Sequence, residues 1–447
     1  MMKAYPLQNL AEAMNGTLVQ GDGGVVMSSG VSTDTRSIPE GALFFALKGE
    51  NFDAHSFLGK AVEAGAGALV VEGAQNLPQG IPVVRVDDTL KALQDLAEWY
   101  RAELGIPVVV ITGSNGKTST NDFTRSVLSQ KFKVNATKGN LNNHIGLPLS
   151  VLATEEDDEV GVFEVGMNHA GELAPLCRIA RPNVSIITNI GTAHIEHLGS
   201  REAIAEEKGT VARALDESGT LLVPASCDFV EQFRATTRGR VMTVGDGMVR
   251  GAKVVPCGTG SSFDLVIEGL GSLATSIPVA GSHMVENALL AAGAGFALGM
   301  KLDEISRGLE QTTLTSGRLR QFQSGEVTVI DDTYNANPES VIAALQTLAG
   351  MPGDGRRVAV LGMMAELGAH ASEAYPRIGR VADELGIVLL TVGDEAEAYA
   401  AGQHFHTNEE AAAWLDQEQT PGDLVLFKGS RMAAMEQVMN LVYPESV

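Results

Sequence analysis

The residues best suited to chemistry lie in the stretch VVVITGSNGKTSTNDF, residues 108–123. Its apolar start predicts a buried strand, its glycines predict a turn, and the residues that follow predict a helix. The backbone amides of such a turn bind anionic oxygens, the lysine reaches phosphates, and the threonine hydroxyl ligates Mg²⁺. The sequence therefore predicts a nucleotide-binding loop made of Gly113, Ser114, Asn115, Gly116, Lys117, Thr118 and Ser119.

This loop departs from the commonest phosphate-loop pattern. The pattern G-x-x-x-x-G-K-[ST] requires a glycine at position 111, where the sequence has Ile111, and Gly113 comes two residues later. The alternative is a tight turn that happens to contain Gly-Lys-Thr. The position of the turn, between a buried strand and a helix, favours nucleotide binding.

Two polar residues follow other apolar strands of the same region. Glu164 ends the strand of VGVFEVG, and His194 lies just beyond the strand of VSIITNI. Open α/β sheets bind ligands at the carboxyl ends of their strands, so both residues are candidates for metal or phosphate contacts. The alternative for Glu164 is a solvated strand end. Lys208, on a helix that we expect Ser200 to cap, has the spacing of an ordinary solvated lysine.

Several further clusters could bind substrate or nucleotide. The loop TKGNLNNHIGLP offers uncharged donors and acceptors, although a turn-rich loop is the alternative. His283 and Asn287 share one helical face and could meet a base or sugar, or form an interdomain contact. Two polar segments, VIDDTYNANPES and LFKGSRM, each follow an apolar strand; a polar turn and a capped helix start are their alternatives. These loops contribute Asn140, Asn142, Asn143, Asp332, Tyr334, Asn335, Asn337, Lys428, Ser430 and Arg431.

The 447 residues suggest about three domains of ~150 residues each. Residues 1–104 mix short strands and helices, and a helix is predicted after residue 88 with Thr89 as its N-cap and Gly105 as its stop. From 105 to 315, apolar β-branched strands alternate with helices, which is typical of a mostly parallel sheet buried on both faces. Residues 250–281 predict a small antiparallel insertion. The alternation resumes over 316–447.

The composition argues against some classes of binding partner. Lysine and arginine number 32 and acids 55, so the formal net charge is −23, which argues against nucleic acid and anionic membranes. The three unpaired cysteines predict reduced thiols in a cytoplasmic protein. No apolar run approaches the ~18 residues of a membrane span. We expect a monomer.

Six motifs taken together resemble one family, the ATP-dependent Mur ligases of peptidoglycan synthesis. They are TGSNGKTS, TKGNLNNHIGLPLS, FEVGMNHAGEL, NIGTAHIEHLGS, DDTYNANPES and KGSRMAAME, in order along the whole chain. The resemblance implies an α/β protein with a small UDP-substrate domain (1–104), a central P-loop-type ATPase domain (105–315) and a C-terminal Rossmann-like ligase domain (316–447). YNANP and KGSRMA imply the activity that joins D-alanyl-D-alanine to UDP-N-acetylmuramoyl-tripeptide through an acyl phosphate.

The resemblance also implies residue roles. Lys117, Glu164, His194 and Lys208 would be catalytic, and Lys208 matches a position that is often carbamylated in the family. Thr118, Glu164 and His194 would hold magnesium, and Asn287, Arg318 and Asp332 would contact ATP. The segment from Ser28 to Phe57 would bind the UDP-substrate through Ser32, Asp34, Arg36, Lys48, Asn51 and His55.

Two positions depart from the family pattern. Met284 replaces a usual asparagine after the helix-opening histidine, and His144 stands where an acidic residue is common. The rival interpretations are another ligase of the same superfamily, which would lack DDTYNANP, and a nucleotide-driven switch, which would need no acceptor site.

Overall fold

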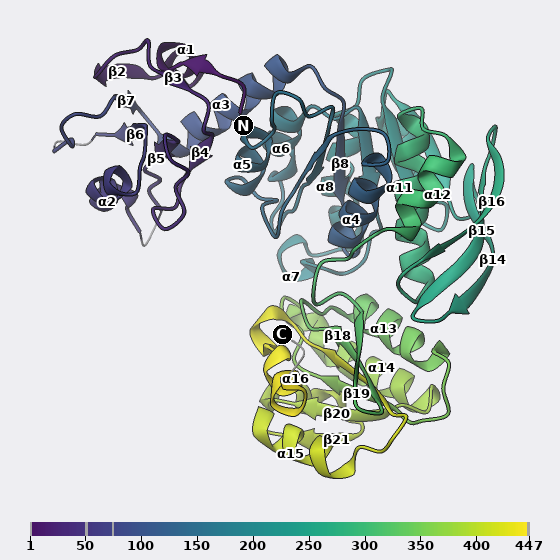
Figure 1. Ribbon diagram of the computed structural model, residues 1–447. Coiled ribbons are helices and arrows are strands. Elements are labelled where there is room, and N and C mark those ends of the chain that lie inside the picture. Colours follow the sequence, from purple (N-terminus) through teal and green to yellow (C-terminus); the bar gives the residue numbers. More distant parts are fainter. Residues whose placement is uncertain (1, 50–51, 74–75, 445–447) are drawn as a thin grey trace.

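Three lobes, each built on its own sheet, follow one another along the chain in the computed structural model (Figure 1). The structure describes residues 2–49, 52–73 and 76–444. Asn51, one of the predicted substrate contacts, lies outside the described residues. Within the described part, none of the helices combines the length and apolar character needed to cross a membrane.

The N-terminal lobe is a five-stranded sheet in the order β2-β7-β6-β5-β4, parallel except for β2. A separate antiparallel pair, β1–β3, lies beside it. The elements are β1 (Tyr5–Pro6), α1 (Leu7–Ala13), β2 (Thr17–Gln20), β3 (Val26–Met27), β4 (Val31–Ser32), β5 (Leu43–Phe45), η1 (Ala54–Phe57), α2 (Leu58–Glu63), β6 (Ala68–Glu72), β7 (Val83–Val86) and α3 (Thr89–Leu104).

Helix α3 connects the first two lobes. Its N-cap is Asp88, whose carboxylate accepts a hydrogen bond from the Lys91 amide at 2.9 Å, so the prediction of Thr89 as N-cap is wrong by one residue. Thr89 is instead the first helical residue and is buried. Gly105 ends the helix in the left-handed conformation, as predicted. The helix packs against α5 (Gly146–Leu152) and α6 (Leu173–Ala180) of the central lobe, where Arg101 donates to the Ala180 carbonyl at 2.8 Å.

The central lobe holds a nine-stranded sheet in the order β16-β15-β14-β13-β12-β11-β8-β10-β9. The predicted antiparallel insertion is present, and β14, β15 and β16 extend the parallel sheet rather than forming a separate unit. Strands β8, β10 and β12 are buried at every residue, as expected for strands covered on both faces. The strands are β8 (Val108–Thr112), β9 (Val134–Ala136), β10 (Val160–Glu164), β11 (Val184–Ile187), β12 (Thr220–Pro224), β13 (Arg240–Val244), β14 (Val249–Cys257), β15 (Gly260–Ile267) and β16 (Gly271–Ile277).

Helices cover this sheet on both sides (Figure 1). They are α4 (Lys117–Leu128), α5 (Gly146–Leu152), α6 (Leu173–Ala180), α7 (Ile195–Leu198), α8 (Arg201–Lys208), α9 (Thr210–Arg213), α10 (Val230–Thr236), α11 (Ser282–Ala297) and α12 (Leu302–Glu310). Ser200 caps α8 as predicted, accepting from the Ala203 amide at 3.2 Å. Phe123 and Val127 of α4 are buried in the same core as Leu289 and Ala292 of α11.

The C-terminal lobe has a six-stranded sheet in the order β17-β18-β22-β19-β20-β21, parallel except for β17. Its elements are β17 (Arg320–Ser324), β18 (Val327–Asp332), α13 (Pro338–Gly350), β19 (Arg357–Leu361), η2 (Gly368–His370), α14 (Ala371–Glu384), β20 (Val388–Val392), η3 (Asp394–Tyr399), β21 (Gln403–Phe405), α15 (Asn408–Glu418), β22 (Leu424–Lys428), η4 (Arg431–Ala433) and α16 (Glu436–Val442). Register places Asp332 beside Lys428 at the carboxyl ends of β18 and β22.

Candidate functional site

A cavity of about 710 Å³ lies where the central and C-terminal lobes meet. The carboxyl ends of β8, β10 and β11 face it from one side, and those of β18 and β22 from the other. The predicted site residues that line it are Ser114, Asn115, Gly116, Lys117, Thr118, Ser119, Asn140, Asn142, Asn143, Glu164, His194, Asn287, Arg318, Asp332, Tyr334, Asn335, Asn337, Lys428, Ser430 and Arg431. Those that do not line it are Gly113, Lys208 and the described N-terminal candidates Ser32, Asp34, Arg36, Lys48 and His55.

Two glycines shape the predicted phosphate loop. Gly113 has φ of 151°, and a Cβ atom there would lie 1.8 Å from the Thr188 hydroxyl oxygen. Gly116 has φ of 78°, and its Cβ would lie 2.6 Å from the Asn287 amide oxygen. Only glycine fits such close approaches in these conformations. The chain turns from β8 directly into α4, whose first residue is Lys117.

The ammonium of Lys117 folds back over this turn. It donates to the Gly113 carbonyl at 2.9 Å, so the lysine side chain is held against the phosphate loop. Burial lowers the pKa of Lys117, the neighbouring Glu164 charge counters that shift, and Arg318 adds to it. A cation held in this way is prepared to bind an anion, since an anion would restore the favourable electrostatics that burial removes.

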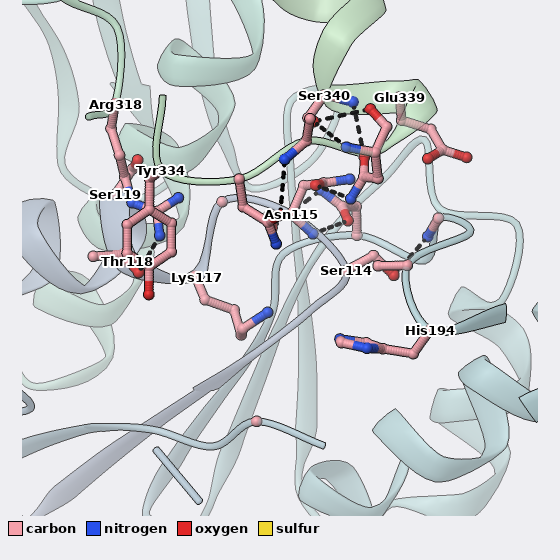
Figure 2. A pocket seen from close by; sticks show the side chains of 18 of the residues that line it. Ser114, Asn115, Lys117, Thr118, Ser119, His194, Arg318, Tyr334, Glu339 and Ser340 are labelled. Atoms are coloured by element: carbon pink, nitrogen blue, oxygen red, sulfur yellow. Dashed lines mark hydrogen bonds between the residues drawn. The ribbon is translucent and has the colours of Figure 1, made fainter. Parts of the chain in front are cut away.

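The segment that follows β11 is hydrogen-bonded to the phosphate loop (Figure 2). The Ser114 amide donates to the Asn189 carbonyl at 3.1 Å, and the Asn115 amide donates to the Asn189 side chain at 2.9 Å. In return, the Gly191 amide donates to the Ser114 hydroxyl at 2.9 Å. Residues 114 and 191 are 77 positions apart in sequence, so this contact joins two separate segments of the chain.

A buried carboxylate faces the start of α4. Glu164 is 1% exposed; its Oε2 accepts from the Thr118 hydroxyl at 3.4 Å, and its Oε1 has no hydrogen-bond partner among the described residues. Burial raises the pKa of Glu164, and Lys117 and Arg318 lower it in part. An unpartnered carboxylate oxygen beside a hydroxyl is the oxygen donor set that Mg²⁺ prefers, so these two residues fit the predicted ion.

His194, the third predicted metal ligand, is engaged elsewhere. Its Nδ1 lies 2.6 Å from Oε2 of Glu366, which comes from the C-terminal lobe. His194 lowers the pKa of that carboxyl. Over the described ranges, no group of three or more histidine, cysteine, aspartate or glutamate side chains is arranged to hold a metal. A shared metal site of Thr118, Glu164 and His194 therefore stays a prediction.

Lys208 is not a solvated lysine, so that alternative is wrong. Its side chain is 1% exposed at the end of α8, and burial lowers its pKa well below the ordinary value, with the positive charge of Lys117 adding to the shift. A neutral amine is the form in which lysine reacts with carbon dioxide. The burial is thus consistent with the predicted carbamylation, which stays a prediction.

The C-terminal side of the cavity contains a buried ion pair. The Lys428 ammonium lies 2.7 Å from Asp332 Oδ2 and also donates to the Asn335 carbonyl at 2.8 Å. Burial raises the pKa of Asp332, and Lys428 lowers it in part. On the linker between lobes, the Arg318 guanidinium lies 4.2 Å from the centre of the Tyr334 ring and donates to the Thr118 hydroxyl at 2.9 Å.

The N-terminal candidates form a separate polar group. Asp34 pairs with Arg36 at 2.6 Å, and this arginine holds the pKa of Asp34 at about 2. His55 lies 2.6 Å from Asp53 through Nδ1 and accepts from the Glu72 amide at 2.9 Å through Nε2. Arg36 is exposed, and its guanidinium is paired with the Asp34 carboxylate. Their roles as substrate contacts stay predictions.

Sequence reasoning did not single out several polar residues of the cavity, among them Asn189, Thr192, Glu339 and Glu366. Glu366 follows the buried strand β19, and a polar residue after a buried strand is the signal that selected Glu164. Applied to every strand, the same criterion would have found it. Thr192 also follows a buried strand, β11, but the sequence does not indicate that it meets Glu339, because that contact depends on how two lobes meet.

Comparison with known proteins gives three family matches along the chain. Residues 28–101 match the catalytic domain of the Mur ligase family, residues 111–295 the Mur ligase middle domain, and residues 317–431 the glutamate ligase domain of Mur ligases. The UDP-N-acetylmuramoyl-tripeptide--D-alanyl-D-alanine ligase of Bacillus subtilis (strain 168) is 36% identical over 450 residues, covering 97% of each chain.

Solved structures agree with the predicted fold. MurF from Acinetobacter baumannii superposes with a TM-score of 0.91 at 33% identity, with 99% of each chain covered. MurF ligase from Thermotoga maritima, solved in complex with ADP, superposes with a TM-score of 0.84 at 26% identity, covering 93% of this chain and 97% of that one. The three-domain α/β fold with mostly parallel sheets is confirmed.

Proposed function

Because the chain belongs to the Mur ligase family, we propose that it joins D-alanyl-D-alanine to UDP-N-acetylmuramoyl-tripeptide and forms ADP from ATP. The observation that carries this proposal is the cavity between the lobes, where the phosphate loop faces the buried Glu164. ATP use is supported by the relative solved with ADP.

The proposed reaction has two steps. The terminal carboxylate of the tripeptide attacks the γ-phosphorus of ATP, the bond to the bridging oxygen breaks, and ADP leaves with that electron pair. The amine of the dipeptide, once deprotonated, attacks the acyl phosphate carbonyl, and the tetrahedral intermediate expels inorganic phosphate. The first step brings two anions together, and the second develops negative charge on the carbonyl oxygen beside the phosphate, so the site must neutralise negative charge in both.

The residues of the chain supply most of that neutralisation. In the proposed complex, the amides of the phosphate loop and the Lys117 ammonium would face the terminal phosphates. Arg318 contacts the same helix start through the Thr118 hydroxyl. Thr118 and Glu164 would hold Mg²⁺, with His194 as a further candidate, and the ion would supply charge neutralisation at the phosphate oxygens. Asn287 and Asp332 line the same cavity, and we propose that Asn287 contacts ATP and that Asp332 contacts its ribose.

The second proposed contact region is the N-terminal lobe, which we expect to bind the UDP part through the group around Arg36. We further expect a monomeric cytoplasmic enzyme that binds neither membrane nor nucleic acid, and light scattering after size-exclusion chromatography tests its oligomeric state. The charge of −23 supports the absence of nucleic acid.

Phosphate release tests the proposal directly. The protein is incubated with ATP, Mg²⁺, UDP-N-acetylmuramoyl-tripeptide and D-alanyl-D-alanine, and each component is omitted in turn. The ligase requires all four, with Lys117→Ala as the inactive control. ATP turnover that is indifferent to both substrates would support a nucleotide-driven switch and refute the ligase.

A further inference from the structure

The first turn of α13 in the C-terminal lobe reaches the phosphate loop of the central lobe (Figure 2). The Asn337 side-chain amide donates to the Asn115 side-chain oxygen at 2.6 Å. Two residues later, Glu339 Oε2 accepts from the Thr192 hydroxyl at 2.9 Å. These contacts join segments that are 222 and 147 residues apart, so they exist only when the two lobes are docked.

Both contacts lead to adjacent residues of the loop. The backbone N–H of Asn115 donates to the Asn189 side chain at 2.9 Å, and its backbone carbonyl accepts from the Thr188 hydroxyl. Because the backbone of Asn115 is held in this way, a contact with its side chain affects the position of the whole residue. Thr192 follows Gly191, whose amide donates to the Ser114 hydroxyl at 2.9 Å. Asn337 therefore acts on position 115, and Glu339 acts through the 191–192 peptide on position 114.

The helix itself orients the Asn337 amide. The Asn337 side-chain oxygen Oδ1 accepts from the backbone N–H of Ser340 at 3.0 Å. In return, the Ser340 hydroxyl accepts from the backbone N–H of Asn337 at 3.0 Å, which is a reciprocal capping box. With Oδ1 committed to the cap, the Nδ2 group is the part that faces Asn115. Glu339 lies in the same first turn, where the helix dipole favours a carboxylate.

We propose that Asn337 and Glu339 are positioning residues that hold Ser114 and Asn115 in their nucleotide-binding shape when the C-terminal lobe is docked. By linkage, nucleotide binding and lobe docking strengthen each other by the same factor. The role of Asn337 is then to shape the loop, rather than to make the substrate contact that the sequence predicted. The proposal rests on the proposed function only for the identity of the nucleotide.

The test separates loop positioning from helix capping. Asn337→Ser keeps a good N-cap oxygen but is too short to reach Asn115, whereas Ser340→Ala weakens the cap and leaves the Asn115 contact in place. Thr192→Val removes the hydroxyl from the second contact at nearly constant volume. ADP affinity is measured by calorimetry on the full chain, and melting temperature, the KM for ATP and kcat are measured on the same variants.

Asn337→Ser and Thr192→Val should each weaken ADP binding between about twofold and tenfold, the effect of one net hydrogen bond. The KM for ATP should rise more than kcat falls. Ser340→Ala should lower the melting temperature and leave ADP affinity unchanged. In an Asn115→Ala background, Asn337→Ser should have no further effect on ADP affinity.

Equal losses of ADP affinity in Asn337→Ser and Ser340→Ala would overturn the proposal in favour of helix stability. Wild-type ADP affinity in both Asn337→Ser and Thr192→Val would overturn it as well. The ADP measurement needs no ligation reaction. A chain that binds ADP but forms no peptide product would refute the proposed function, and the ADP affinities of the variants would still test the positioning role of Asn337 and Glu339. A wild-type chain that binds no ADP would refute both.

Discussion

Replacing Lys428 by methionine tests how the C-terminal part of the site is held together. Lys428 is 3% exposed, and its ammonium lies 2.7 Å from Asp332 Oδ2. At that distance, two unit charges attract by about 6 kcal/mol for an effective permittivity of about 20. Water and the Leu319 amide, which donates to Oδ1 of the same carboxylate, recover part of this in the variant. We expect the free energy of unfolding to fall by about 3 kcal/mol near neutral pH.

The loss should depend on pH, and its sign follows from Asp332. Burial already raises the pKa of this carboxyl above 3.8, and removing Lys428 removes the charge that lowers it in part. The folded variant therefore prefers the protonated carboxyl more strongly than the unfolded chain does. A carboxyl whose folded pKa is raised lowers the stability of the protein as pH rises from its unfolded to its folded pKa. The defect should therefore shrink in acid and reach its full size above the folded pKa of Asp332.

Urea unfolding followed by tryptophan fluorescence measures this loss. In a Trp99→Phe background, Trp414 of α15 reports the C-terminal lobe alone, because the chain has two tryptophans. Adding Asp332→Asn to Lys428→Met should restore most of the lost stability, since no charge is then left buried. A loss below about 1 kcal/mol that does not vary with pH would show that water screens the pair and would refute the argument.

Three further predictions concern the central lobe. Gly116→Ala should weaken ADP binding at least tenfold, because strain of about 1–2 kcal/mol adds to the contact with Asn287; Gly105→Ala, with positive φ but open space, is the control, and equal binding in both would contradict the close-approach argument. Glu164→Gln should lower kcat about a hundredfold while the melting temperature holds or rises, because the amide avoids burying a charge; undiminished phosphate release would remove Glu164 from the mechanism. Lys208→Met should raise the free energy of unfolding by about 1 kcal/mol, because it removes a buried amine whose pKa burial lowers. The rise in the free energy of unfolding toward alkaline pH that this lysine causes should disappear in the variant. A variant that is destabilised in thermal unfolding would show that Lys208 carries a stabilising partner or modification.

Local patterns predicted the elements of this fold well. The apolar β-branched runs before Gly113 and through Glu164 correspond to β8 and β10, and the antiparallel segment over 250–281 is present as β14 to β16. These predictions are confirmed because strand burial and turn formation depend on residues that are neighbours in the sequence. The N-cap of α3 was missed by one position because both Asp88 and Thr89 can cap a helix, and only backbone geometry decides between them.

Contacts between lobes could not be predicted in the same way. The sequence selected Asn337 and His194 as polar residues after strands, but it did not indicate that one would meet Asn115 and the other Glu366. Such pairs depend on the packing of two independently formed sheets. Lys208 was interpreted as a surface residue because lysine is usually solvated, although its spacing places it on the buried face of α8 with Ile204 and Ala205.

Helix α3 affects any attempt to divide the chain. Its inner face shares one apolar cluster with both the first sheet and helices α5 and α6, through residues such as Leu96, Ala97 and Tyr100. A recombinant fragment that begins at the predicted boundary of 105 would leave the α5–α6 surface bare and prone to aggregation. A fragment that begins at Asp88 would keep that surface covered, and it is the better starting point for crystallising or labelling the nucleotide-binding part alone.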